Sequence, residues 1–180
     1  MSYVDLSLGE DAQEEFAKVL FRCRRATEDE DKYEHWDLKG GLQDLGTKRL
    51  TFDVKDNVDR ERKAFPVELQ GITGEPGWLY GKADCMAYNH PESFTVIWRE
   101  ELVALVERLM EEHCVDLNWY TDDEADWTVL GQGKPGQMVY RRLKWGRDDR
   151  VVLVDADELF AVANAIVLKG SKSDSKGLGA

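Results

Sequence analysis

A strict alternation of apolar and polar side chains over residues 49–56 constrains the fold of this chain more than any other feature. One face of the segment carries Leu50, Phe52 and Val54, and the other carries Thr51, Asp53 and Lys55. A period of two residues is the period of a β-strand with one buried face. The fold must therefore contain a sheet whose apolar face is covered by another layer.

Two neighbouring segments also show strand character. Residues 65–70 alternate again, and residues 33–38 are rich in aromatic side chains and precede a Gly-Gly turn signal. Upstream, residues 9–25 repeat apolar side chains at spacings of three and four, which predicts an amphipathic helix. We expect the three strands to be antiparallel neighbours, with the helix packed on their apolar face.

The rest of the chain mixes both kinds of element. Helical periodicity covers residues 100–113, and residues 157–168 form a second expected helix with Asp155 or Asp157 as its N-cap. Strands are expected within residues 78–88, 94–98, 138–145 and 151–154. The sequence thus predicts an α/β (α+β) fold with a mixed central sheet flanked by helices.

A length of 180 residues suits a single domain, which we place at residues 1–169. The tail, residues 170–180, consists mainly of Gly, Ser and Lys, a composition typical of disorder. No segment approaches the roughly 20 apolar residues that span a bilayer, and the first residues lack a secretory signal pattern. We therefore expect a cytoplasmic protein with no membrane partner.

Three polar residues on two of the expected strands are suited to one reacting centre: Asp37, Asp53 and Lys55, here called the acid–lysine cluster. Asp53 and Lys55 project from the same strand face about 7 Å apart. A hairpin would bring Asp37 beside them. Converging carboxylates repel each other unless a cation lies between them, and Mg²⁺ favours carboxylate, water and phosphate oxygens. Both aspartates are therefore candidate ligands of Mg²⁺ or Mn²⁺.

The order of these elements resembles the PD-(D/E)xK family of metal-dependent phosphodiesterases, in particular its phage-encoded nucleases. A helix carrying a Glu, a strand with Asp37 and a strand with Asp53-Val54-Lys55 follow one another, although Trp36 stands where the family's name has proline. The resemblance covers about residues 9–109. It implies Mg²⁺ held by the two aspartates, with Lys55 positioning or helping to deprotonate the attacking water.

The same resemblance divides the expected domain. It implies a restriction-endonuclease-like core at about residues 9–113, followed by a strand and helix extension at residues 114–169. The partner that it implies is a nucleic acid, with DNA favoured.

Two other elements supply further candidate catalytic residues. On the helical wheel of residues 9–25, Glu15 lies at the flank of the apolar face, whereas Glu14 points away from it. Glu15 is therefore the favoured helix acid. The polar face of residues 65–70 adds Glu68, a candidate metal ligand, and Gln70.

The distribution of charge bears on the substrate. A formal net charge of −12 opposes binding to phosphates. Basic residues nevertheless gather over residues 134–150, and the nucleic-acid contacts predicted there are Arg141, Arg142, Lys144 and Arg147. The resemblance thus implies a nuclease, but the sequence does not distinguish DNA from RNA or cleavage at ends from cleavage in the interior.

Two other classes of function remain open. An acidic protein on this scaffold can be a non-catalytic binding module or inhibitor that presents carboxylates, in place of phosphates, to a DNA-binding partner. It can also be a structural subunit or homodimer, with aromatic residues of segment 118–127 at an interface. Binding of a divalent metal ion would distinguish the nuclease from both alternatives.

Overall fold

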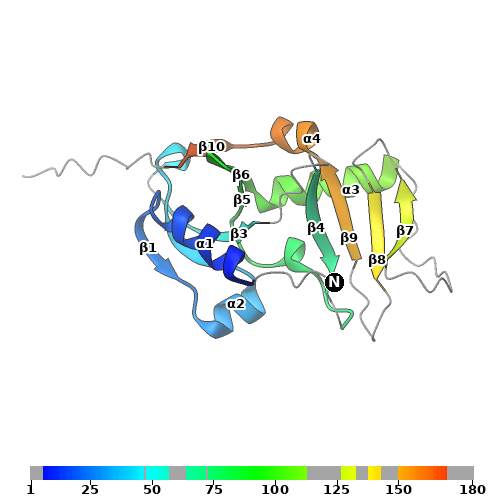
Figure 1. Ribbon diagram of the computed structural model, residues 1–180, viewed down its shortest axis with the longest axis horizontal. Helices are drawn as coiled ribbons and strands as arrows, with labels where there is room; N and C mark the ends of the chain where they lie inside the picture. The colour runs from blue at the N-terminus through cyan, green and yellow to red at the C-terminus, as the bar shows by residue number, and fades with distance from the viewer. Residues whose placement is uncertain are drawn as a thin grey trace, which may run out of the picture. The chain divides into compact units, whose positions relative to one another are not determined.

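The computed structural model describes residues 6–46, 48–56, 64–71, 73–112, 127–132, 138–142 and 150–169. These residues form mixed α and β structure, which confirms the class predicted from the sequence (Figure 1). They divide into two compact units, one with Met1–Asp56, Lys82–Ile97 and Ala163–Ala180, the other with Asn57–Gly81 and Trp98–Val162. Whether both belong to the single domain expected at residues 1–169 stays a prediction.

None of the described helices combines the length and the apolar character needed to cross a membrane. The expected disorder of residues 170–180 falls outside the described part of the chain, as do most of the aromatic residues of segment 118–127.

The first unit contains a six-stranded sheet in the order β1-β2-β3-β5-β6-β10. The strands are β1 (Phe21–Arg25), β2 (Leu38–Gly41), β3 (Arg49–Lys55), β5 (Cys85–Asn89), β6 (Ser93–Trp98) and β10 (Ala165–Leu168). β2 pairs antiparallel with β1 and β3, and β10 pairs antiparallel with β6, whereas β3 and β5 are parallel. The sheet is therefore mixed, as the sequence predicted.

Helix α1 (Leu6–Ala17) covers the apolar side of this sheet. The ring of Phe16 lies 5.2 Å from that of Phe52 on β3 and 4.8 Å from that of Phe94 on β6. All three rings are fully buried. The packing of an N-terminal helix on the apolar face of β3 is therefore confirmed.

The helix is shorter than the predicted span of residues 9–25. Lys18, Val19 and Leu20 donate backbone hydrogen bonds to carbonyls three residues earlier, at 3.3, 3.1 and 3.4 Å, so the last turn tightens and ends. Val19 and Leu20 are buried in this turn. Their burial explains why helical spacing continued in the sequence although the chain had already turned towards β1.

The strand predicted at residues 33–38 is also corrected. Residues Glu28–Glu34 form helix α2, and β2 begins only at Leu38. Thr27 and Glu30 form a capping box: the Glu30 N–H donates to the Thr27 hydroxyl at 3.3 Å, and the Thr27 N–H donates to the Glu30 carboxylate at 2.9 Å. A capping box is a helix start that can be seen in the sequence, but the aromatic side chains of residues 33–38 led to their interpretation as a strand.

The predicted antiparallel pairing of β3 with residues 65–70 is wrong. The neighbour of β3 on that side is β5, in parallel register from Phe52 opposite Cys85 to Lys55 opposite Tyr88. Asp84, just before β5, fixes this register, because its carboxylate accepts hydrogen bonds from the Thr51 N–H at 2.8 Å and hydroxyl at 2.9 Å. A strand buried on both faces reads as a continuous apolar run, so it lacks the alternation used for prediction.

The second unit contains a four-stranded sheet in the order β4-β9-β8-β7. Its strands are β4 (Ala64–Gln70), β9 (Arg150–Asp155), β8 (Met138–Arg142) and β7 (Trp127–Gln132), and the three pairings are antiparallel. Figure 1 shows these four strands side by side. Helix α3 (Arg99–Glu112) closely matches the predicted 100–113 and buries its apolar face.

Two C-terminal predictions need adjustment. The helix predicted at residues 157–168 ends at Ala161 as α4 (Ala156–Ala161), capped by the Asp155 carboxylate, which accepts from the Asp157 N–H at 2.9 Å. Residues 165–168 instead form β10 at the edge of the first sheet. The segment 78–88 begins as a short 3-10 helix, η2 (Trp78–Tyr80), before β5.

Candidate metal centre

The two aspartates of the acid–lysine cluster face each other across β2 and β3. Leu38 pairs with Phe52, so continuing the register by one residue sets Asp37 opposite Asp53. The Asp37 N–H donates to the Phe52 carbonyl at 2.8 Å, and the Asp37 Oδ2 accepts from the Val54 N–H at 2.6 Å. Opposite residues of an antiparallel pair have Cα atoms about 4.5–5.5 Å apart. The hairpin therefore brings the two carboxylates together from positions 16 residues apart in sequence.

Asp53 is a buried acid with one unsatisfied oxygen. The residue is only 3% exposed. Its Oδ1 accepts an ion-paired hydrogen bond from the Lys55 ammonium at 2.7 Å, whereas its Oδ2 is buried without a hydrogen-bond partner. A buried polar atom left unpaired costs free energy, so such an atom in a folded protein points to a missing partner. The partner of such an oxygen is a cation or a donor, and the protonated carboxyl of Asp37, whose hydrogen bond with Asp53 also affects the pKa values of both groups, is one such donor.

Electrostatics point the same way. Burial, reinforced by the charge of Asp53, raises the pKa of Asp37 from its ordinary 3.8 to about 7. Burial also raises the pKa of Asp53, although Lys55 acts in the opposite direction. Two buried carboxylates with raised pKa values favour either a shared proton or a bound cation. A divalent ion would therefore compete with protons for this pair.

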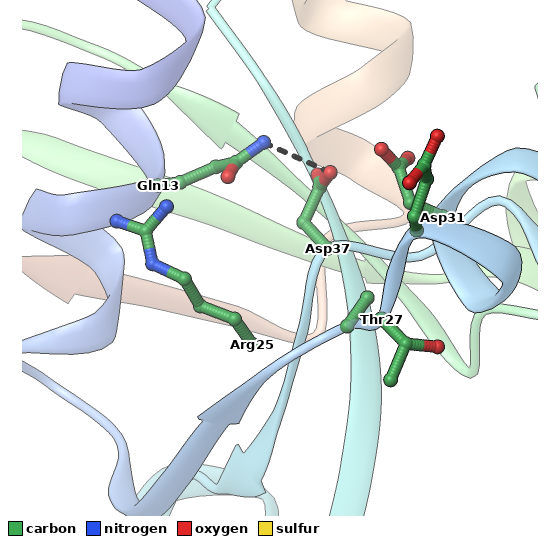
Figure 2. A pocket seen from close by; sticks show the side chains of 7 residues that line it. Gln13, Arg25, Thr27, Asp31 and Asp37 are labelled. Atoms are coloured by element: carbon green, nitrogen blue, oxygen red, sulfur yellow. Dashed lines mark hydrogen bonds between the residues drawn. The ribbon is translucent and has the colours of Figure 1, made fainter.

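Gln13, which the sequence analysis missed, contacts the cluster from α1. Its Nε2 donates to Asp37 Oδ1 at 2.9 Å (Figure 2). The predicted helix acid, Glu15, is instead ion-paired with Lys18, and its side chain is 44% exposed. Gln13 lies three residues before buried Phe16 and seven before buried Leu20, so it belongs to the packed flank of the helix. Gln13 carries no charge, so it did not stand out as a candidate metal ligand in the sequence.

A cavity of about 260 Å³ opens beside Asp37. Figure 2 shows Asp37 and Gln13 pointing towards each other, with Arg25, from the end of β1, lying nearby. The cavity is lined by Gln13, Arg25, Ala26, Thr27, Glu28, Asp31 and Asp37. One carboxylate of the pair is thus reachable from a hollow in the first unit.

Tyr88 is a second neighbour that the sequence did not single out. It is fully buried on β5 and lies opposite Lys55 in the parallel register. Burial raises the pKa of its hydroxyl, and the charge of Asp53 acts in the same direction. Tyr88 therefore lies within electrostatic reach of the acid–lysine cluster, although the apolar run around it signalled only a core strand.

The remaining predicted site residues lie in the second unit. Glu68 and Gln70 are on β4, where the Glu68 carboxylate accepts from the Trp78 N–H at 3.4 Å. Arg141 and Arg142 are on β8, whereas Lys144 and Arg147 fall outside the described residues. Participation of these residues in one site with Asp37 and Asp53 stays a prediction.

The donor set at Asp37 and Asp53 fits one particular mode of metal binding. Within the described residues, no group of three or more His, Cys, Asp or Glu side chains could hold a metal ion. Mg²⁺ is often bound by only one or two carboxylates, with waters and substrate phosphates completing its shell. The two facing carboxylates, one with an unpartnered oxygen, suit this mode and do not suit an all-protein cage.

Comparisons of the chain with protein-family models, with curated proteins and with solved structures found no match.

Proposed function

We propose that this protein is a metal-dependent nuclease, with a restriction-endonuclease-like core in its first unit and phosphodiester bonds as its substrate. The observation that carries the proposal is the buried Asp53, whose Oδ2 lacks a partner while Lys55 holds its Oδ1. The facing Asp37, with its raised pKa, adds a second oxygen ligand in the same place. DNA is the favoured substrate.

The roles of the three side chains follow from their chemistry. Asp37 and Asp53 would hold a Mg²⁺ or Mn²⁺ ion, which when bound lowers the pKa of water and neutralises charge on a phosphoryl group. Lys55 carries a positive charge next to this pair, where it can donate to the attacking water or to a phosphate oxygen. Gln13, on α1, would hold the orientation of Asp37 through its hydrogen bond to Oδ1.

Burial strengthens this arrangement. Lys55 has a side chain only 19% exposed, and Asp53 is almost completely buried. Charges in such surroundings interact more strongly than they do in water. A phosphate that replaced water at this position would therefore gain from both the lysine and the ion.

Cleavage assays with a matched pair of variants test the proposal. Wild type, Asp53→Asn and Asp44→Asn would be incubated with single-stranded, duplex and branched DNA and with RNA, in Mg²⁺ or Mn²⁺ at low salt. Asp44 is an exposed aspartate of the same unit, so its variant matches the change in charge. We expect wild type and Asp44→Asn to cleave and Asp53→Asn to lose cleavage.

No cleavage of any substrate by wild type would contradict the nuclease proposal. The acidic binding module and the structural subunit would then be the functions to pursue, through a search for a protein partner.

A further inference from the structure

Several cations of the first unit are not neutralised by a nearby acid. Five of its described Lys and Arg side chains contact a carboxylate, in the pairs Lys18–Glu15, Arg24–Glu30, Arg25–Glu14, Lys55–Asp53 and Lys82–Glu34. No carboxylate partner among the described residues contacts Arg22, Lys39, Lys48 or Arg49. In a chain with a net charge of −12, unpaired cations that gather in one place are unexpected.

Strand register shows that these cations do gather. Gly41 pairs with Phe21 of β1 and with Arg49 of β3, and Lys39 lies two residues away on β2. Arg22 follows Phe21 in the irregular part of β1, where its φ is 50° and its side chain is exposed. Neighbouring strands are about 4.8 Å apart. Arg22, Lys39 and Arg49 thus occupy one end of three adjacent strands and are here called the basic patch.

Two members of the basic patch, Lys39 and Arg49, lie on the same sheet face as the acid–lysine cluster. Lys39 pairs with Thr51, and Thr51, Asp53 and Lys55 share one face of β3 with Arg49. Arg49 lies four residues before Asp53, which corresponds to about 13 Å along the strand. Each DNA strand carries one phosphate per about 3.4 Å of helix axis. The distance from the patch to the aspartates therefore matches a few successive phosphates.

We propose that Arg22, Lys39 and Arg49 bind the phosphate backbone of a nucleic acid and carry its strand into the acid–lysine cluster. This inference rests on the proposed function and adds the surface that engages the substrate. An acidic protein would also be attracted to the patch. A nucleic acid is favoured because Lys39 and Arg49 of the patch share a sheet face with an aspartate whose unpartnered oxygen suits a phosphate-bound ion.

The experiment compares two triple variants that change the charge equally. One replaces the patch, as Arg22→Gln, Lys39→Gln and Arg49→Gln. The control replaces three exposed cations that have carboxylate partners, as Lys18→Gln, Lys82→Gln and Arg108→Gln. Binding of fluorescent single-stranded and duplex DNA would be measured by anisotropy in EDTA, which prevents metal-dependent cleavage, across a range of salt concentrations.

We expect the patch variant to bind DNA about tenfold or more weakly than wild type at about 50 mM salt. The slope of log K against log salt should also fall by about two to three, because about three phosphate contacts are lost. The control should remain within about twofold of wild type, since its cations are already paired with carboxylates.

Three results would overturn the inference: equal weakening in both variants, competition by polyglutamate as effective as by DNA of equal charge, or no binding of DNA by wild type even at low salt. Failure of the proposed nuclease function can be distinguished from failure of the basic patch by the cleavage assay. If wild type cleaves nothing but the patch variant alone loses DNA binding, the surface is correct and catalysis is not. If wild type cleaves and the patch variant cleaves with an unchanged KM, the proposed catalysis is correct and the basic patch does not bind the substrate.

Discussion

The raised pKa of Asp37 makes a quantitative prediction for the metal-free protein. The folded state keeps a proton on Asp37 up to about pH 7, whereas the unfolded chain releases it near 3.8. Between these values the folded state binds more protons, so the free energy of unfolding falls as pH rises through this window. A difference of about three pH units corresponds to about 4 kcal/mol at most.

Replacement of the acid by its amide, Asp37→Asn, isolates this effect. The introduced amide oxygen can still accept from the Val54 N–H, and Gln13 can turn its own amide to accept from the new N–H donor. The variant lacks the buried charge. In EDTA we expect Asp37→Asn to be more stable than wild type at pH 8, by up to about 4 kcal/mol. The difference should shrink towards zero near pH 4.

Urea unfolding of both proteins at several pH values measures the difference directly, because all other titrating groups are common to the two. Saturating Mg²⁺ should reverse the order at pH 8, since the ion stabilises only the protein that binds it. Parallel pH profiles, or a wild type more stable than Asp37→Asn at pH 8 without metal, would refute the argument that burial and the facing Asp53 raise this pKa.

The remaining predictions concern the metal, the helix and the core. Mg²⁺ should raise the melting temperature of wild type in a concentration-dependent way and leave that of Asp53→Asn unchanged in a thermal scan; a shift in both proteins would place the ion elsewhere. Gln13→Ala should lower the initial rate of cleavage about tenfold, whereas Glu15→Gln should leave it within about twofold of wild type. The opposite ranking would show that Glu15, and not Gln13, is the helix residue that acts in the site. Phe16→Ala should cost about 3–5 kcal/mol in urea unfolding, because its ring packs between two strands; a cost below about 1 kcal/mol would contradict that packing.

Prediction from sequence succeeded where a local pattern and the tertiary environment agree. The alternation around Phe52 identified β3 and its buried face, and the neighbour of β3 was expected to bring Asp37 beside it, although that strand, β2, begins only at Leu38. Helix α3 was found for the same reason, since one face of it is buried and its apolar spacing is regular.

The errors came from segments whose pattern has two explanations. Burial of Val19 and Leu20 in a tight turn continues a helical spacing after the helix has ended. The partner of β3 is decided by a contact distant in sequence, between Asp84 and Thr51, which no local pattern encodes. Gln13 was missed because only acidic side chains of the helix were considered as candidates. An amide can also take part in the site, since it donates a hydrogen bond to the Asp37 carboxylate.

The most direct test of the acid–lysine cluster separates binding from chemistry in Lys55→Ala. Mg²⁺ affinity, from calorimetry, and phosphodiester cleavage would be measured on the same preparation, with Lys82→Ala as an exposed, ion-paired lysine control. Lys55→Ala should keep metal binding, because both carboxylates remain, and lose cleavage by about 10²-fold or more, because the charge acting on water and phosphate is gone. A Lys55→Ala protein as active as wild type would contradict the account.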